Sequence, residues 1–462
     1  MKHTDIIQKL NLEQKCALLS GETVFTTRAL PGKGIPAITL SDGPNGVRKQ
    51  AGAADHLGLN PSVPATCFPT SSATACSWDE KLGEAVGEAL GEEAAAQEVA
   101  VLLGPGLNIQ RSPLCGRDFE YFSEDPILAG RMAAAYVRGI QKNGISACPK
   151  HFAVNSQELR RMASDSVLDE RTLRELYLTG FEIVVKEAKP KTIMTSYNLI
   201  NGTYANENAH LLQDILRKDW GFDGAVVTDW GGSNDHALGV KNGSTLEMPC
   251  PGGDSIRELM KAVKNGKVTE ADLDARLDEL LELVLSTHAA VEKAPRTFDA
   301  AAHHALARRA AAESIVLLKN EDGILPLKAG EKLAVIGDFA QTPRYQGAGS
   351  SAVNALQVDA LLDCIKADDS GISFVGYASG FDRQGAADPK KQEEAVSLAK
   401  QADTVLLCLG LDELRESEGL DRADMALAEN QQQLLDAVAA VNPNVVVLLS
   451  AGAPVETPWV GR

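Results

Sequence analysis

Short apolar runs alternate with longer amphipathic runs through the first 290 residues of the chain. The short runs are bounded by glycine, proline or polar residues, which is typical of buried strands. These predicted strands are 35–40, 99–103, 145–149, 192–196 and 225–227. Between them, runs rich in Ala, Glu and Leu predict helices at 79–99, 127–142 and 271–287. The alternation predicts an α/β fold, most simply a barrel of roughly 250 residues.

Two helix starts are predicted from local pattern. Residues 1–25 are expected to form an amphipathic helix and its exit. A second helix is expected to begin at the capping box that runs from Ser166 to Asp169. The apolar residues that follow this box share one helix face, so we assign them to the core.

The predicted strand 225–227 lies within the segment 221–232, which carries the clearest chemical signal. Glycines flank the strand, and Asp229 and Trp230 follow its carboxyl end. Burying a carboxylate costs free energy unless the group is paired, so a buried one is expected to have a partner or a function. A carboxylate beside an indole suits a sugar, because the carboxylate can attack an anomeric carbon and the indole offers a flat apolar face. The alternative is that Asp229 only caps the next helix.

Other polar residues also follow the ends of predicted strands. They are Asp42, Arg117, Lys150, His151 and Tyr197. In a TIM-like (β/α)8 barrel the carboxyl ends of all strands lie on one rim, where the active sites of such enzymes occur. The pattern therefore predicts that these side chains and Asp229 form one site.

A second α/β unit follows. We predict a barrel domain at 1–290, a linker at 291–305 and an α/β sandwich domain at 306–462. Its expected strands are 333–336, 372–375, 404–409 and 445–449, with helices at 355–366, 388–401 and 426–441. Four strands leave an open edge, so we expect this domain to be truncated at its C-terminus.

Two loops of the second unit draw attention. The glycine-rich loop 347–351 lacks the lysine of a phosphate-binding loop, so it is weak evidence for phosphate binding. The loop 412–422 is rich in acidic residues and directly follows a predicted strand. By itself, its charge is most simply explained by exposure to solvent.

Composition narrows the function classes. The net charge of −18 argues against a nucleic-acid surface. No signal peptide or run of about 18–20 apolar residues is visible, so no membrane partner is expected. The eight cysteines are scattered without metal-ligand spacing, so we expect free thiols, no metal and a cytoplasmic location. The sequence gives no sign of a cofactor.

Six motifs, taken together and in order, resemble the family 3 glycoside hydrolases, in their β-glucosidase branch. They are Ser41–Pro44, Gly116–Glu120 with Ser123–Pro126, Lys150–Phe152, Ser196–Asn198, Gly221–Trp230 and Glu418–Arg422. The resemblance covers nearly the whole chain. It implies a barrel followed by an α/β sandwich, with the active site between them.

The resemblance also implies residue roles. Asp229 would be the nucleophile and Glu418 the acid/base of a retaining, exo-acting β-glucosidase that forms a covalent glycosyl-enzyme. The matching residues that would bind the substrate are Asp42, Arg117, Lys150, His151, Arg161, Met194, Tyr197, Trp230 and Ser350. Paired carboxylates with different pKa values are how glycosidases work. The expected partner is a small β-glucoside or oligosaccharide, and a homo-oligomer or a second chain completing the sandwich is possible.

Alternatives remain open at this point. A β-xylosidase or β-N-acetylhexosaminidase of the same family is one, although Asp42 and Ala153 differ from the residues usual in those branches. An aldolase-like barrel that uses Lys150 as a Schiff-base lysine is another. The third is a non-catalytic sugar-binding fragment, because the family's sandwich has more strands than this sequence provides.

Overall fold

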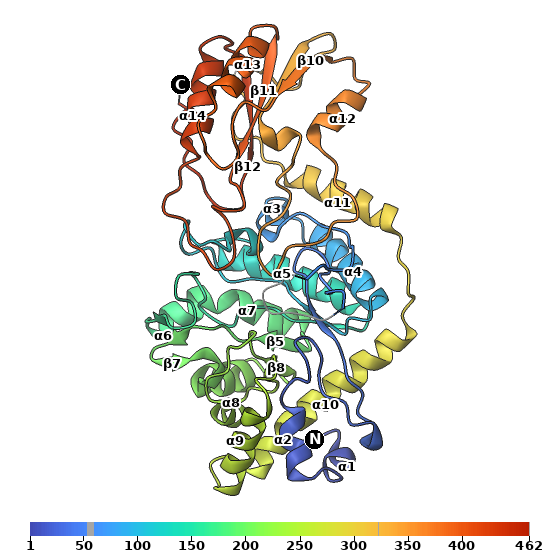
Figure 1. Cartoon of the computed structure of the whole chain (residues 1–462). Helices are drawn as coiled ribbons and strands as arrows, with labels where there is room; N and C mark the ends of the chain where they lie inside the picture. The colour runs from blue at the N-terminus through green and yellow to red at the C-terminus, as the bar shows by residue number, and fades with distance from the viewer. Residues whose placement is uncertain (53–59, 322, 462) are drawn as a thin grey trace.

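The computed structural model describes residues 1–52, 60–321 and 323–461. Figure 1 shows two α/β domains stacked along the long axis of the molecule, with the C-terminal domain at the top. Each has its own apolar core. In the described residues, no helix is both long and apolar enough to cross a membrane. All eight cysteines are described, and all are free thiols, as the sequence predicted.

The first domain contains several short parallel strands at its centre. β1 (Leu40–Asp42), β2 (Val101–Leu103) and β3 (Ser146–Ala147) form one parallel sheet. β5 (Thr192–Met194) pairs in parallel with β8 (Ala225–Val227), and single bridges such as Phe152 to Thr195 continue the same direction. A small separate sheet contains β4 (Asp165–Ser166), β6 (Leu199–Ile200) and β7 (Thr203–Tyr204). An α/β architecture is therefore observed, whereas the eight-stranded barrel is not established by these pairings.

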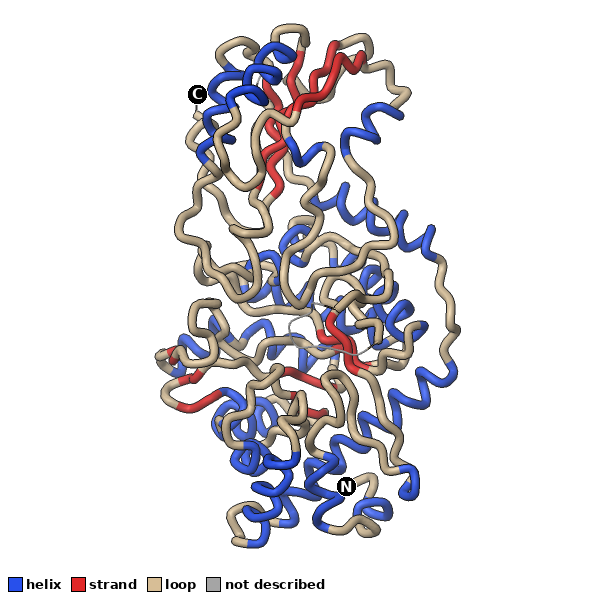
Figure 2. Tube along the Cα trace, viewed as in Figure 1, coloured by secondary structure: helices blue, strands red, loops and turns tan. Residues whose placement is uncertain are grey.

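Helices surround these strands (Figure 2). The longer ones are α4 (Glu80–Ala96), α5 (Pro126–Gln141), α9 (Gly253–Lys264) and α10 (Glu270–Lys293). Shorter ones are α1 (Thr4–Ile7), α2 (Leu12–Leu18), α3 (Ser71–Ala75), α6 (Glu170–Thr172), α7 (Thr179–Ile183) and α8 (His236–Asn242). π-helical segments, 173–177 and 184–188, flank α7, and a third spans 210–219.

Both predicted helix starts need correction. The N-terminal helix is two helices, because Asn11 caps α2 with a reciprocal bond to Gln14. The predicted capping box at Ser166 is also wrong. Ser166 belongs to strand β4, where it pairs with Ile200 of β6. The helix begins at Glu170, and Asp169 caps it by accepting from the Thr172 amide at 2.7 Å.

The predicted linker 291–305 is mostly helical. α10 continues to Lys293, and α11 (Ala300–Ser314) begins six residues after Ala294. α11 packs on α3 and α4, and its Ala310 belongs to the core of the first domain. The irregular connection is therefore confined to 294–299.

The second domain is a parallel sheet in the order β10-β9-β11-β12. Its strands are β9 (Lys332–Ile336), β10 (Ser373–Ala378), β11 (Thr404–Gly410) and β12 (Val445–Ser450), close to the predicted ones. α12 (Leu361–Ala367), α13 (Pro389–Ala399) and α14 (Glu429–Ala439) connect them. β12 is an edge strand and is half-buried along its length. Truncation of the domain stays a prediction.

Glycines allow α4 and α5 to pack closely. A Cβ atom on Gly87 would overlap the main chain of Tyr136, and one on Gly139 would overlap the main chain of Glu84. α5 also packs on β3, which is followed by the predicted site residues Lys150 and His151.

We expect Gly87→Ala to lower the midpoint of urea unfolding. Helix propensity alone would stabilise the variant by about 1 kcal/mol, but overpacking against Tyr136 costs typically about 1–3 kcal/mol. Gly32→Ala is the control, because a Cβ there meets no atom within 4 Å. An unchanged or higher midpoint for Gly87→Ala would contradict the close packing.

Candidate active site

Asp229 lies just beyond β8 and is 8% exposed. Its Oδ1 accepts from the Trp230 amide at 2.8 Å, while Oδ2 is buried without a hydrogen-bond partner in the described residues. The nearest ring nitrogen, Nε2 of His151, is 3.6 Å from Oδ2. The next helix, α8, is capped by Asp235. Asp229 is therefore not a helix cap, and one of its oxygens is available to another molecule.

Aromatic side chains surround this carboxylate. The indole Nε1 of Trp230 donates to the Val24 carbonyl at 2.7 Å, which fixes the ring, and Phe25 packs beside it with ring centroids 5.3 Å apart. The Tyr197 hydroxyl donates to the Trp230 carbonyl at 2.9 Å. Arg161 lies over the Tyr197 ring, 4.7 Å from its centroid. These contacts bring three predicted substrate-binding residues together beside Asp229.

Glu120 holds two of the predicted cations. Its Oε2 accepts from Arg117 Nη2 at 2.7 Å, and its Oε1 lies 3.1 Å from Lys150 Nζ. All three side chains are at most 2% exposed. Burial raises the pKa of Glu120, but Arg117 and Lys150 outweigh it and hold that pKa below its ordinary value. Glu120 entered the sequence-based prediction only as the end of the Gly116–Glu120 motif, without a role, although the Arg117-x-x-Glu120 spacing was a usable signal.

His151 is oriented by two residues that sequence reasoning also missed. Its main chain makes two bonds to the Asn108 side chain, at 2.7 and 2.8 Å. Its Nδ1 lies 3.2 Å from the Tyr121 hydroxyl. Burial lowers the pKa of His151 well below its ordinary value, and Arg117 and Lys150 lower it further. The ring facing Asp229 is therefore neutral at pH 7.

Asp42 ends β1 on the same side of the domain. Burial raises its pKa to about 6, against the opposing effect of Lys150. Met194, at the end of β5, is 2% exposed and belongs to the core, and its carbonyl accepts from the Phe152 amide at 2.7 Å. Met194 therefore contributes to the support of the site.

Glu418 comes from the second domain. Its Oε1 accepts from Arg161 Nη1 at 2.8 Å and lies 3.4 Å from Arg117 Nη1. Its Oε2 accepts from the Ser350 amide at 2.7 Å. Burial raises the pKa of Glu418, but the two guanidinium groups and Ser350 outweigh it, so the pKa is well below its ordinary value. Glu418 is therefore ionised in the free protein.

The loop 412–422 is not the solvated acidic loop that its composition suggested. Asp412, Glu416 and Arg422 are buried, and Glu418 is bound to the first domain. Asp118, next to Arg117, is also buried, and burial together with Glu416 raises its pKa to about 8. Glu418 and Asp421 of this loop thus contact the first domain, whereas Asp412 and Glu416 bond to residues of their own domain.

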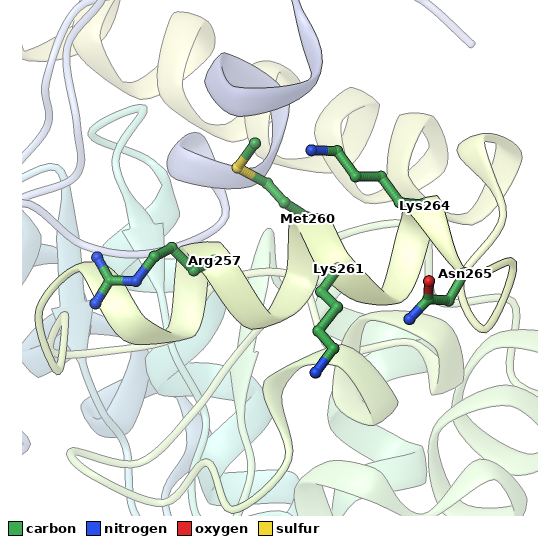
Figure 3. A pocket seen from close by; sticks show the side chains of 5 residues that line it. All are labelled: Arg257, Met260, Lys261, Lys264 and Asn265. Atoms are coloured by element: carbon green, nitrogen blue, oxygen red, sulfur yellow. The ribbon is translucent and has the colours of Figure 1, made fainter.

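A surface pocket on α9 does not coincide with this site. Figure 3 shows its lining side chains, which are Arg257, Met260, Lys261, Lys264 and Asn265. None of them is a predicted site residue. The site between the domains is instead defined by its buried ion pairs and by the free oxygen of Asp229.

Comparison with known proteins shows the family of this chain. Residues 48–283 match the glycosyl hydrolase family 3 N terminal domain, and residues 315–462 match the family's C-terminal domain. The thermostable beta-glucosidase B of Acetivibrio thermocellus is 46% identical over 460 residues, which cover 99% of this chain and 60% of that protein. An exo-alpha-(1->6)-L-arabinopyranosidase of Bifidobacterium longum is 45% identical, over 98% of this chain and 61% of its own length.

Solved structures agree. The GH3 beta-glucosidase of Bifidobacterium adolescentis has a TM-score of 0.92 and 43% identity, covering 98% of this chain and 65% of that one. Beta-glucosidase 3B from Thermotoga neapolitana, in complex with alpha-D-glucose, has a TM-score of 0.88 and 33% identity, covering 99% and 70%. The chain spans about 60% of the length of the curated relatives named above. It belongs to glycosyl hydrolase family 3.

Proposed function

We propose that this chain carries the active site of a retaining β-glucosidase, with Asp229 as nucleophile and Glu418 as acid/base. The observation that supports it best is the buried, unpartnered Oδ2 of Asp229 at the end of β8. Asp42, Arg117, Lys150, His151, Arg161, Tyr197 and Trp230 would bind the glucosyl group. Ser350 would hold Glu418, and Met194 would support the base of the pocket.

The charges around Asp229 suit a nucleophile. Burial raises the pKa of Asp229, and Arg117, Arg161 and Lys150 oppose that rise. These cations favour the ionised form of Asp229, which attack on an anomeric carbon requires. The uncharged His151 ring can donate or accept one hydrogen bond with a sugar hydroxyl without adding charge.

A general acid must carry a proton, whereas Glu418 is ionised in the free protein. We expect the hydroxyl groups of the bound sugar to take over donors of Arg117 and Arg161. Glu418 would then lose the contacts that lower its pKa and would accept a proton more readily. Binding of the glucosyl group would in this way prepare the acid for the leaving group.

Lys150 does not suit the aldolase-like alternative. A Schiff-base lysine needs a neutral amine. Burial lowers the pKa of Lys150, but Glu120 outweighs it and the pKa is above its ordinary value. Its ammonium group is therefore a fixed cation, which suits binding of sugar hydroxyls.

A second candidate substrate is an α-L-arabinopyranoside. The relative from Bifidobacterium longum, which is named for this activity, is 45% identical to this chain, against 46% for the β-glucosidase of Acetivibrio thermocellus. Initial rates on the nitrophenyl β-D-glucoside, α-L-arabinopyranoside, β-D-xyloside and N-acetyl-β-D-glucosaminide separate the candidates. The β-glucoside should have the highest kcat/KM. A higher kcat/KM on any of the other three glycosides would contradict the proposed substrate.

The barrel and the partners also remain proposals. The parallel pairs β1-β2-β3 and β5-β8, with the parallel bridges from Gly106 to Lys150 and from Val227 to Leu246, support a barrel-like arrangement of the first domain. We retain the sequence-based expectations of a cytoplasmic protein and of a possible homo-oligomer or second chain.

Asp229→Asn should lower kcat by several orders of magnitude, because the amide cannot attack the anomeric carbon. A 2-fluoro-glucoside should label the wild-type protein, and peptide mass spectrometry should locate the adduct on Asp229. Asp223→Asn, at the exposed other end of β8, is the control and should retain activity. An adduct on another residue would disprove the assignment.

Glu418→Ala should damage hydrolysis of cellobiose far more than that of dinitrophenyl glucoside. General acid catalysis is worth about 10²–10⁴-fold, and a dinitrophenolate leaves without it. Azide should restore turnover of the activated substrate by replacing the water that Glu418 activates. Equal losses on both substrates, without azide rescue, would mean that another group is the acid/base, with Glu416 the next to test.

A further inference from the structure

The loop that carries Glu418 crosses from the second domain to the first. Figure 1 shows loops of the second domain extending down to the first domain. The contacts of Glu418 itself cannot hold this loop during catalysis, since the proposed function requires them to change when the sugar binds. Other contacts must therefore keep the Glu418 backbone in place.

Asp421, three residues after Glu418, makes the most extensive of these contacts. Its Oδ1 accepts from the amides of Gly116, at 3.2 Å, and of Glu158, at 2.9 Å. Its Oδ2 accepts from the amides of Glu158, at 3.1 Å, and of Leu159, at 2.8 Å. One carboxylate of the second domain thus binds three main-chain amides of the first domain. Hydrogen bonds to an ionised acceptor are about twice as strong as neutral ones.

Glu158 makes the reverse contact. This first-domain side chain is 3% exposed, and its Oε2 accepts from the Gly419 amide at 2.8 Å. The same oxygen accepts from Arg161 Nη1 at 2.8 Å. The carboxylates of Glu158 and Asp421 thus each bind main-chain amides across the interface. In the second domain the residues involved, Gly419 and Asp421, lie within three residues of Glu418.

The main chains also approach closely at this point. A Cβ atom on Gly116 would overlap the carbonyl oxygens of Leu420 and Ser417. Only glycine permits this approach, and it places the Gly116 amide within reach of Asp421. Arg117, the next residue, binds Glu418. The contact therefore sets the spacing between the loop and the cations of the site.

We propose that Asp421, assisted by Glu158, is a positioning residue that holds Glu418 over the reacting bond. Asp421 touches neither the substrate nor the reacting atoms, and acts only by fixing the loop through first-domain amides. A displacement of about 1 Å at a catalytic group can cost about 10²-fold in rate. This inference rests on the proposed acid/base role of Glu418.

Asp421→Asn is the variant of choice, because it keeps the size of the side chain but loses one accepting atom. We expect kcat/KM on cellobiose to fall about 10–100-fold, and kcat/KM on dinitrophenyl glucoside to fall less than about threefold. Asp424→Asn is the matched control, since Asp424 is exposed in the same segment and, among the described residues, accepts only from the Ala426 amide of that segment. It should behave as wild type.

A double variant separates positioning from loss of folding. If Asp421 acts through Glu418, adding Asp421→Asn to Glu418→Ala should cause no further loss on either substrate. Losses that multiply, or an equal fall on both substrates in the single variant, would overturn the positioning role. The Glu418→Ala variant alone tests the proposed function. If it lost equal activity on cellobiose and on dinitrophenyl glucoside, the acid/base role of Glu418 would be rejected, whatever Asp421 does.

Amide hydrogen exchange gives a readout that does not depend on activity. Asp421→Asn should speed exchange in peptides that contain Gly116, Glu158 and Leu159, and Glu158→Gln should speed it in the peptide that contains Gly419. The Asp424→Asn control should change neither. Unchanged exchange at these amides in the Asp421 and Glu158 variants would disprove the contacts on which the inference rests.

Discussion

The buried guanidinium of Arg117 is the constraint on which the site depends. A cation that is 1% exposed is very unfavourable unless carboxylates compensate it. Glu120 supplies one from the first domain. Glu418 supplies the other from the second domain, and it also pairs with Arg161 of the first domain. Contact with the second domain thus adds a second carboxylate to Arg117, and the same contact brings Glu418 to the site.

Part of this arrangement could be predicted because it is local. Apolar runs that end in polar residues placed β8 before Asp229. They also placed the strands of the second domain within one residue of their observed bounds, except for the end of β10, which lies three residues later than predicted. The family motifs then named both carboxylates. Asp229, His151, Tyr197 and Trp230 do lie together, because parallel strands bring their carboxyl ends to the same side.

The rest depends on contacts between distant segments. Glu120 and Asp421 lie within predicted motifs, but neither could be assigned a role from the sequence. Only the folded chain shows that Glu120 binds Arg117 and Lys150, and that Asp421 binds amides of the first domain. The predicted capping box at Ser166 failed because Ser166 instead pairs in a strand with Ile200, a partner from a distant segment that the local pattern does not reveal. Barrel closure likewise depends on strand pairings that periodicity cannot specify.

The central claim is that Asp229 and Glu418, one from each domain, act on opposite sides of a single glycosidic bond. Retention requires their carboxyl groups to lie about 5–5.5 Å apart around the bond, against about 6.5–9.5 Å for inversion. Proton NMR of the sugar first released from a nitrophenyl β-D-glucoside tests this directly. The account predicts that β-glucose forms first and then mutarotates. Initial release of α-glucose would contradict it.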